Sequence, residues 1–234
     1  MVEVLASPGA RARHPNLVGT ADAGGVPWHE VDPMLLRSVT ETVADQGVVA
    51  IAHLTTPDPH ALWSASARLI AGLCDVRDPG NAGTVIRCAD AAGADGVLLL
   101  GESVDPYNGK CVRASAGSLF HLPVLPGMSV ADGVAAARGA GLAVLAADGA
   151  GDVRLDEAGE LLTRPTLWLF GNEAAGLSDH QRALADDVVA IPVHGRAESL
   201  NLAAAAVLCL YASAGAQRGS GRGRAGRIPS DPGR

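Results

Sequence analysis

Three separated segments of the chain combine glycines with polar or charged side chains. The first, residues 75–87 (DVRDPGNAGTVIR), contains a Pro-Gly turn, then Asn81 where a helix is expected to open, and Arg87 almost two helical turns further on. A helix start offers free N–H groups and a positive dipole end, which favour a bound anion such as a phosphate. On its own, such a segment is usually just a helix start, and Arg87 just a surface cation.

The second segment, residues 170–178 (FGNEAAGLS), directly follows the apolar run 167–169. Glycines on both sides of Glu173 allow the backbone to bend sharply and a ligand to approach closely. A carboxylate placed directly after a buried strand can accept hydrogen bonds from a substrate. The alternative is a plain turn into the next helix, with Glu173 placed there for the helix dipole alone.

The third segment, residues 191–201 (IPVHGRAESLN), leads from the end of an expected strand into a strongly apolar run. Ser199 and Asn201 lie where a helix is expected to begin. Because serine is a preferred N-cap residue, this segment taken alone is explained by helix capping. Only its combination with the other two segments indicates a functional site.

Between about residue 61 and residue 214, stretches typical of strands alternate with stretches typical of helices. Strands are expected at 69–74, 96–100, 122–125, 142–147, 167–170 and 190–193. Helices are expected at 81–92, 130–139 and 200–212, with a further helical piece beginning at residue 115. This alternation predicts an α/β fold in which crossover helices connect parallel strands.

The composition divides the chain into four regions. Residues 1–54 hold short alternating elements, with helices expected at 17–23 and after Asp32-Pro33, and strands at 26–31 and 47–54. Residues 55–60 contain two prolines and are expected to form a linker to the main domain, residues 61–214. Residues 215–234 are rich in Gly and Arg and poor in apolar side chains, which predicts a disordered tail.

The overall composition indicates which kinds of core, partner and cysteine chemistry are expected. Apolar residues make up 48% of the chain, enough for a sizeable core, and the formal net charge is −7. An acidic balance counts mildly against a nucleic-acid partner, although a basic patch can lie on an acidic protein. The four cysteines form no C-x-x-C pair and have no histidine at metal-ligand spacing, so reduced thiols and no metal are expected.

The chain shows no sign of a membrane or export segment. Its first residues lack a basic start followed by an apolar run, and its longest apolar stretch, residues 202–212, is shorter than the roughly 20 residues that cross a bilayer. We therefore expect a soluble cytoplasmic protein.

Taken together and in this order, the three segments resemble the signature motifs of the SpoU (TrmH-like) branch of the SPOUT RNA methyltransferases. The matching pieces are NAGTVIR, FGNEAAGLS and IPVHGRAESLNLAAA, and the resemblance covers roughly residues 70–211. It implies methyl transfer from S-adenosylmethionine to a ribose 2′-hydroxyl of a structured RNA. It also implies an α/β domain with a C-terminal trefoil knot, and a homodimer with active sites at the subunit interface.

The resemblance also assigns candidate site residues. Backbone groups of Leu169, Gly171, Ile191 and Leu200 are expected to hold the cofactor by their motif positions. The N-terminal part is similar to the latter portion of a small substrate-binding domain related to ribosomal protein L30e, here shortened. In the Gly- and Arg-rich tail, Arg218, Arg222, Arg224 and Arg227 either do nothing specific or add affinity for RNA.

The resemblance further implies roles in the reaction. The family's arginine at the position of Arg87 is proposed as the base, but a guanidinium is effectively always protonated. Two alternatives follow: an RNA phosphate near Arg87 helps to shuttle the proton, or Arg87 stays cationic and stabilises the developing alkoxide while another group accepts the proton. We favour the second. Asn81 is expected to position Arg87 or the ribose, while Glu173, Ser199 and Asn201 orient the substrate and the cofactor.

Three alternatives remain open from the sequence. The chain could be a non-catalytic RNA-binding module that kept the fold, although its motifs are intact. It could be a doubly wound enzyme for a small molecule, although it lacks a glycine-rich phosphate-binding fingerprint after a strand. Within the favoured interpretation the RNA is rRNA or tRNA, and the N-terminal extension favours rRNA.

Overall fold

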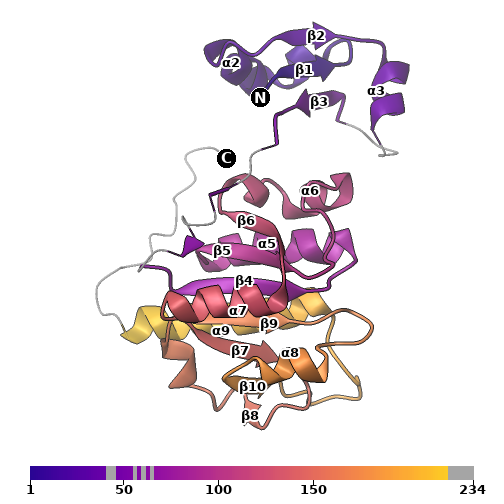
Figure 1. The fold of residues 1–234 in the computed structure, drawn as a ribbon. Coiled ribbons are helices and arrows are strands. Elements are labelled where there is room, and N and C mark those ends of the chain that lie inside the picture. The colour runs from indigo at the N-terminus through magenta and orange to yellow at the C-terminus, as the bar shows by residue number, and fades with distance from the viewer. Residues whose placement is uncertain (41–45, 55–56, 59–61, 64–65, 221–234) are drawn as a thin grey trace. The chain divides into compact units, whose positions relative to one another are not determined.

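The computed structural model describes residues 1–40, 46–54, 57–58, 62–63 and 66–220. The chain divides into two compact units, Met1–Thr56 and Pro57–Arg234, which are described separately below (Figure 1). Most of the expected linker, residues 55–60, and residues 221–234 of the expected tail lie outside the described residues.

The N-terminal unit is a small three-stranded sheet with short helices. Its elements are β1 (Glu3–Ala6), α1 (Ala10–Arg13), α2 (Pro15–Ala23), β2 (Trp28–Glu30), α3 (Pro33–Val39) and β3 (Val48–Ile51). The strand order is β2-β1-β3, with β1 parallel to β2 and antiparallel to β3. Asp32 caps α3 by accepting the N–H of Met34 at 2.7 Å, as the Asp-Pro pair predicts. Strand β1 was not predicted, because four residues are too few for a recognisable alternation.

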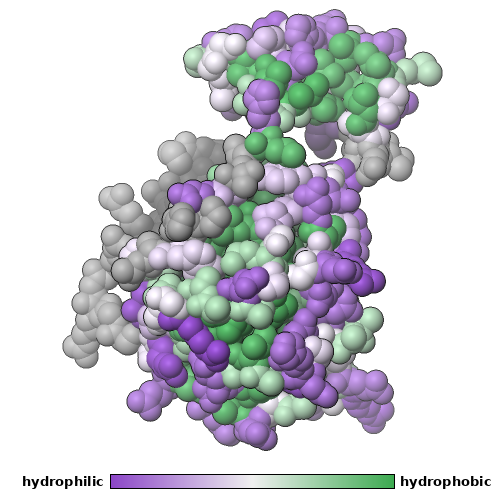
Figure 2. Space-filling view, in the orientation of Figure 1, coloured by the Kyte–Doolittle hydropathy of each residue, from purple (hydrophilic) through white to green (hydrophobic). Residues whose placement is uncertain are grey.

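The core of this unit is thin. Its buried apolar side chains are Val4, Ala6, Ala10, Ala21 and Leu36. Several larger apolar side chains stay at the surface, among them Met34 at 78% and Leu54 at 70% exposure. Figure 2 shows the resulting broad hydrophobic area on the visible face of this unit. A unit of this size buries little apolar surface, so its own contribution to stability is small.

The C-terminal unit is built on a seven-stranded sheet. The strands are β4 (Leu69–Cys74), β5 (Gly96–Leu100), β6 (Val124–Met128), β7 (Ala143–Ala147), β8 (Val153–Arg154), β9 (Thr166–Phe170) and β10 (Asp187–Ala190). Their order is β6-β5-β4-β9-β7-β10-β8, and every strand pair described in this sheet is parallel. The predicted α/β fold with parallel strands is therefore confirmed.

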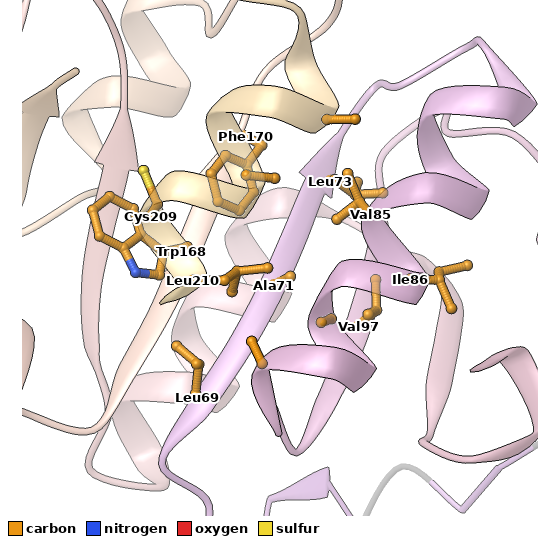
Figure 3. Packing of buried hydrophobic residues seen from close by; sticks show 14 of the residues in the cluster. Leu69, Ala71, Leu73, Val85, Ile86, Val97, Trp168, Phe170, Cys209 and Leu210 are labelled. Carbon is orange, nitrogen blue, oxygen red and sulfur yellow. The ribbon is translucent and has the colours of Figure 1, made fainter. Parts of the chain in front are cut away.

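Helices cover both faces of the sheet. They are α5 (Pro79–Ala92), α6 (Gly109–Ser115), η1 (Ser118–Phe120), α7 (Val130–Gly139), η2 (Leu161–Thr163), α8 (Asp179–Ala183) and α9 (Leu202–Ser220). Side chains of α5 and α9 pack on one face, against Leu69, Ala71 and Leu73 of β4 (Figure 3). Side chains of α7 pack on the other face, with Ile70 and Cys74. Alternate residues of one central strand thus point into two separate apolar layers.

Several predicted boundaries are wrong. The helical piece expected to begin at residue 115 is instead α6, which ends there; Ala116 and Gly117 then turn in left-handed conformations before η1. The strand expected at 190–193 is β10 at Asp187–Ala190, because Pro192 has no N–H to donate to a ladder. Helix α5 begins two residues before Asn81, with Pro79 in its first turn.

The closing helix also differs from its prediction. It starts at Leu202 rather than Leu200 and continues to Ser220, so the first residues of the expected disordered tail are helical. Gln217 explains this extension, since its side-chain amide donates to the carbonyl oxygens of Arg68 and Arg164. Arg218 donates to the carbonyl of Ala92 at 2.7 Å, at the end of α5. Tertiary hydrogen bonds therefore keep residues 215–220 helical, although the composition of this segment predicts disorder.

Candidate active site

A cavity of about 550 Å³ lies at the carboxyl ends of β7, β9 and β10. Asp148 and Gly149 line it after β7, residues 170–176 after β9, and Ile191 after β10. Residues 198–202 line it where the chain enters α9. In parallel α/β sheets, ligands bind at this edge, because the loops that follow the strands gather there. The second and third motif segments thus form two walls of one cavity.

A chain of side-chain hydrogen bonds links all three motif segments at the rim of this cavity. The amide nitrogen of Asn201 donates to Oδ1 of Asn81 at 3.1 Å. The amide nitrogen of Asn81 in turn donates to Oε1 of Glu173 at 3.2 Å. The structure therefore brings together three of the five residues predicted to take part in the reaction.

Glu173 binds the start of α5 rather than the helix that follows it in sequence. Its carboxylate accepts the backbone N–H groups of Arg77 at 3.4 Å and Asp78 at 3.3 Å. Asp78 caps α5 by accepting the N–H of Asn81 at 2.8 Å. The N–H groups that were expected to attract a phosphate are therefore occupied by carboxylates of the chain itself. An anion site at this helix start is not supported.

Asp78 also joins α5 to α6. Nζ of Lys110 donates to Oδ2 of Asp78 at 2.7 Å. The hydrogen bond from Lys110, followed by that from the Asn81 N–H, holds the pKa of Asp78 below its usual value of 3.8. The single lysine of the chain is thus paired with the residue that caps the motif helix.

The turn that carries Glu173 is held by its own backbone and by Asn172. Oδ1 of Asn172 accepts the N–H of Ala174 at 2.9 Å, and its amide donates to the carbonyl of Asp75 at 2.7 Å. A Cβ on Gly171 would overlap the backbone of Gly176 and Leu177, so only glycine fits at the start of this turn. These contacts position the carboxylate of Glu173 against α5.

Arg87 lies elsewhere. It is exposed on α5, and within the part of the chain that the structure describes its side chain has no hydrogen-bond or ion-pair partner and does not line the cavity. Gly83, one turn earlier on the same face, packs against Cys111 and Ala114 of α6. By spacing, Arg87 could share a helix face with Asn81 or with Thr84. Six residues correspond to a rotation of about 240°, which excludes Asn81, whereas Thr84 is three residues away.

The remaining predicted residues fall close to the cavity. Ser199, Gly171, Ile191 and Leu200 line it, and Leu200 is 39% exposed. Leu169 is fully buried in β9 and is not among the described residues that line the cavity. Asn201, not Ser199, caps α9, since Oδ1 of Asn201 accepts the N–H of Ala203 at 2.9 Å.

Sequence reasoning missed two pairs next to the site. Asp148 at the end of β7 accepts from Arg182 of α8 at 3.1 Å, and both line the cavity. Asp75, after β4, accepts from the amide of Gln181 at 2.7 Å. No local pattern marks Asp148 or Arg182. Asp75 lies within the first motif segment, where an aspartate directly after a buried strand was the available signal.

Within the described residues, no group of three or more histidine, cysteine, aspartate or glutamate side chains is placed to hold a metal ion. Among those same residues, no helix is both long and apolar enough to span a membrane.

The main domain of this chain matches a known protein family. The model of the SpoU rRNA Methylase family matches residues 68–211. A 23S rRNA (uridine(2479)-2′-O)-methyltransferase of Streptomyces viridochromogenes is 47% identical over 154 residues, which cover 62% of this chain and 51% of that protein. The 23S rRNA (guanosine(2553)-2′-O)-methyltransferase RlmP of Bacillus subtilis (strain 168) is 33% identical over 80% of this chain and 72% of that protein. The chain thus spans about half the length of the first relative.

Solved structures extend the likeness to nearly the whole chain. The SpoU methyltransferase AviRb from Streptomyces viridochromogenes, in complex with the cofactor AdoMet, matches with a TM-score of 0.78 and 36% identity, over 94% of this chain and 83% of that one. The family match covers the cavity, the hydrogen-bonded chain of Asn201, Asn81 and Glu173, and most of the parallel sheet. This chain is therefore a member of the SpoU rRNA methylase family.

Proposed function

We propose that this chain transfers a methyl group from S-adenosylmethionine to a ribose 2′-hydroxyl of rRNA. The observation that carries the proposal is the hydrogen-bonded chain from Asn201 through Asn81 to Glu173, which joins three sequence segments at one cavity rim. Both curated relatives above act on 23S rRNA, which favours rRNA over tRNA as the substrate class. The proposed ribosomal substrate places the reaction in the cytoplasm.

The cavity fits the proposed cofactor. Its volume of about 550 Å³ lies within the range of small-molecule sites, roughly 300–1,000 Å³. Phe170, Ile191 and Leu202 supply apolar walls, and Asp148 is a polar group on the rim. Backbone groups of Gly171, Ile191 and Leu200 hold the cofactor in this proposal, while Leu169 supports the turn from within β9. When bound, S-adenosylmethionine supplies an electrophilic methyl group.

The residues at the rim orient the acceptor. The 2′-oxygen must approach in line and lose its proton as it attacks. Asn81 and Asn201 present amide groups, and Glu173 a carboxylate, toward the ribose, with Ser199 beside them. Because the carboxylate of Glu173 is held by α5, the three polar groups keep one arrangement without the substrate. We therefore assign Asn81, Asn201 and Glu173 the role of orienting the ribose.

Arg87 enters the reaction from a second copy of the chain. It lies outside the cavity lining of its own chain, yet a cation near the developing alkoxide lowers the barrier. An exposed apolar stripe on α9 supports association, since Ala204, Leu208 and Tyr211 share one face, with Leu208 45% and Tyr211 50% exposed. We infer a homodimer in which this stripe and the exposed face of α5 meet their counterparts.

Two finer features of the fold belong to the same proposal. The segment between β10 and α9 forms part of the trefoil knot expected for this family, and the packing of α9 against α5 and β4 supports that arrangement. The N-terminal unit acts as a shortened L30e-like RNA-binding segment. The arginines of residues 221–234 add RNA affinity in this proposal.

Methyl transfer to ribosomal RNA tests the proposal. The full chain is incubated with isotope-labelled S-adenosylmethionine and, in separate reactions, unmodified 23S rRNA, 16S rRNA and bulk tRNA, and the product is mapped by alkaline resistance of the 2′-O-methylated linkage. Incorporation into 23S rRNA at one ribose is expected. Cofactor binding without transfer to any RNA would identify a non-catalytic module, and transfer to tRNA alone would overturn the substrate class.

The variants to compare are Arg87→Lys and Arg87→Ala. Arg138→Gln is the control, because Arg138 pairs with Asp186 and does not line the cavity. Loss of one preorganised donor costs roughly 10²–10³ in rate. Arg87→Ala is therefore expected to lose about that factor in single-turnover rate, Arg87→Lys less, and Arg138→Gln nothing. Sedimentation separates loss of the dimer from loss of chemistry. A steep rise in Arg87→Lys activity near the pKa of lysine would mean that this position acts as a base.

A further inference from the structure

Helix α6, seen next to α5 in Figure 1, and the short helix η1 both pack against α5 in the same apolar layer of the sheet. Both contact α5, and they contact each other. The N-terminal end of α6 is fastened next to the site, because Lys110 binds Asp78, the cap of the helix that carries Asn81. Among the described residues, none of α6 or η1 lines the cavity. An RNA strand whose target ribose lies at Asn81 would pass this surface.

Helices α6 and η1 contain two cationic residues, Lys110 and Arg113, and no acidic residue. No aspartate or glutamate occurs between Asp105 and Asp132, whereas the chain carries a formal net charge of −7. The nearest acidic side chains of α5 are already paired, Asp78 with Lys110 and Asp90 with His121 at 2.7 Å. Arg113 of α6 is exposed, and among the described residues its guanidinium has no hydrogen-bond or ion-pair partner.

Helix η1, which contacts α6, carries an exposed aromatic ring. Phe120, the last residue of η1, is 69% exposed, which makes it the most exposed aromatic side chain of the chain. Removal of apolar surface from water is favourable, so the exposed ring of Phe120 gains free energy when a partner covers it. Bases of single-stranded RNA stack on such rings while cations nearby follow the phosphates.

We propose that α6 and η1 form a docking surface for an unpaired stretch of the RNA substrate, in which Phe120 stacks on a base and Arg113 binds a phosphate. This rests on the proposed function, because it assumes that RNA reaches the cavity rim. A double-stranded stretch cannot present a base face to Phe120, so the surface selects unpaired RNA next to the modified ribose. The competing occupant of the same face is a second copy of the chain.

Fluorescence anisotropy on the full chain tests the proposal with two probes, a short unstructured oligoribonucleotide and an RNA duplex of similar length. Phe120→Ala is expected to bind the single strand about tenfold more weakly and the duplex unchanged. Phe120→Tyr, which keeps a stacking ring, is expected to bind like the wild type. Arg113→Gln is expected to weaken binding to both probes and to lower the slope of log affinity against log salt for the single strand by about 0.7.

Arg164→Gln is the matched control, since Arg164 is an exposed arginine at the start of β9, at the opposite edge of the sheet from the cavity. It is expected to leave both affinities unchanged. Calorimetry with S-adenosylmethionine shows that each variant is folded. If Phe120→Ala does not fold, Phe120→Tyr and the exposed Arg113→Gln still test the proposal. If this surface binds RNA, Arg113→Gln must show a lower slope of log affinity against log salt than the wild type.

The proposal is overturned if Phe120→Ala and Arg113→Gln bind the single strand as the wild type does, or if the wild type binds neither probe. It is also overturned if Phe120→Ala changes the sedimentation coefficient from dimer to monomer, which would assign the face to a second copy. Wild-type transfer to rRNA with unchanged binding by both variants would reject the surface alone. Wild-type binding that depends on Phe120, without transfer to any RNA, would reject the proposed function alone.

Discussion

The side-chain amide of Gln181 donates a hydrogen bond to Oδ2 of Asp75 over 2.7 Å. Asp75 itself has a φ of 55°, a left-handed conformation that is uncommon for a residue other than glycine. Its second carboxylate oxygen accepts the N–H of Glu102 at 2.8 Å, and its carbonyl accepts the amide of Asn172 at 2.7 Å. One aspartate therefore ties the loops after β4, β5 and β9 to α8, and the Glu173 turn is one of those loops.

Loss of the hydrogen bond between Gln181 and Asp75 is expected to weaken binding of S-adenosylmethionine rather than slow the chemical step. Gln181→Ala loses a hydrogen bond to a charged group, worth about 1.5–3 kcal/mol, and with it part of the support of the turn that walls the cavity. We expect the dissociation constant for S-adenosylmethionine to rise about tenfold with little change in kcat at saturation. Calorimetry and steady-state kinetics measure the two quantities. Gln217→Ala, at the opposite edge of the sheet, is the control, and an equal loss there would point to general destabilisation.

Gly83 lets α5 pack tightly against α6. A Cβ at this position would overlap the carbonyl of Cys111 and come within 2.7 Å of Cβ of Ala114. Gly83→Ala is therefore expected to lower the free energy of unfolding by about 1–3 kcal/mol, because α6 must move off α5. Gly139→Ala, in α7, meets nothing within 4 Å and is expected to be neutral or slightly stabilising. Urea denaturation compares the two. Equal stabilities would show that the helices are not packed this closely.

The indole of Trp168 anchors α9 to β9. Its N–H donates to Oγ of Ser213 at 2.9 Å, and both residues are fully buried. Ser213→Ala leaves a buried N–H without its partner, which is expected to cost about 1–3 kcal/mol of stability. Trp168→Phe combined with Ser213→Ala removes both polar groups, so the second change should cost less in that background. A double-mutant cycle on unfolding free energies measures the coupling, and additive effects would contradict the contact.

The ion pair of Asp78 and Lys110 predicts a defined pH dependence. Since the pKa of Asp78 is lowered in the folded chain, the carboxylate contributes stability that is present above its usual value of 3.8 and is lost as pH falls through the lowered pKa. Asp78→Asn keeps a capping side chain but loses the charge. It is expected to be less stable than the wild type at neutral pH, with the difference vanishing in acid.

Lys110→Met provides the independent check on that pH dependence. Without the hydrogen bond from Nζ, the pKa of Asp78 is expected to rise toward its usual value, which an NMR titration of the side-chain carboxyl carbon follows directly. A stability difference between wild type and Asp78→Asn that persists unchanged in acid would show that charge at this position is not what stabilises the helix start.

The sequence alone determined which elements form the main unit and which segments carry chemistry. Apolar runs such as Leu69–Cys74 and Gly96–Leu100 mark buried strands because a strand covered on both faces has no polar positions. Asp32-Pro33 marks a helix start because capping is a contact between near neighbours. The three motif segments were likewise readable, since residue types and spacing within each are local properties.

The tertiary structure alone decided which of these groups meet. Asn81 reaches Glu173 across 92 residues of sequence and Asn201 across 120, and Arg87, only six residues from Asn81, faces elsewhere. Gln217 and Arg218 are helical because of contacts with Arg164 and Ala92, against the composition of their own segment. Local sequence sets conformational preferences over a turn or a strand, but the partner of a side chain depends on the path of the whole chain, which is specified by the packing of many residues at once.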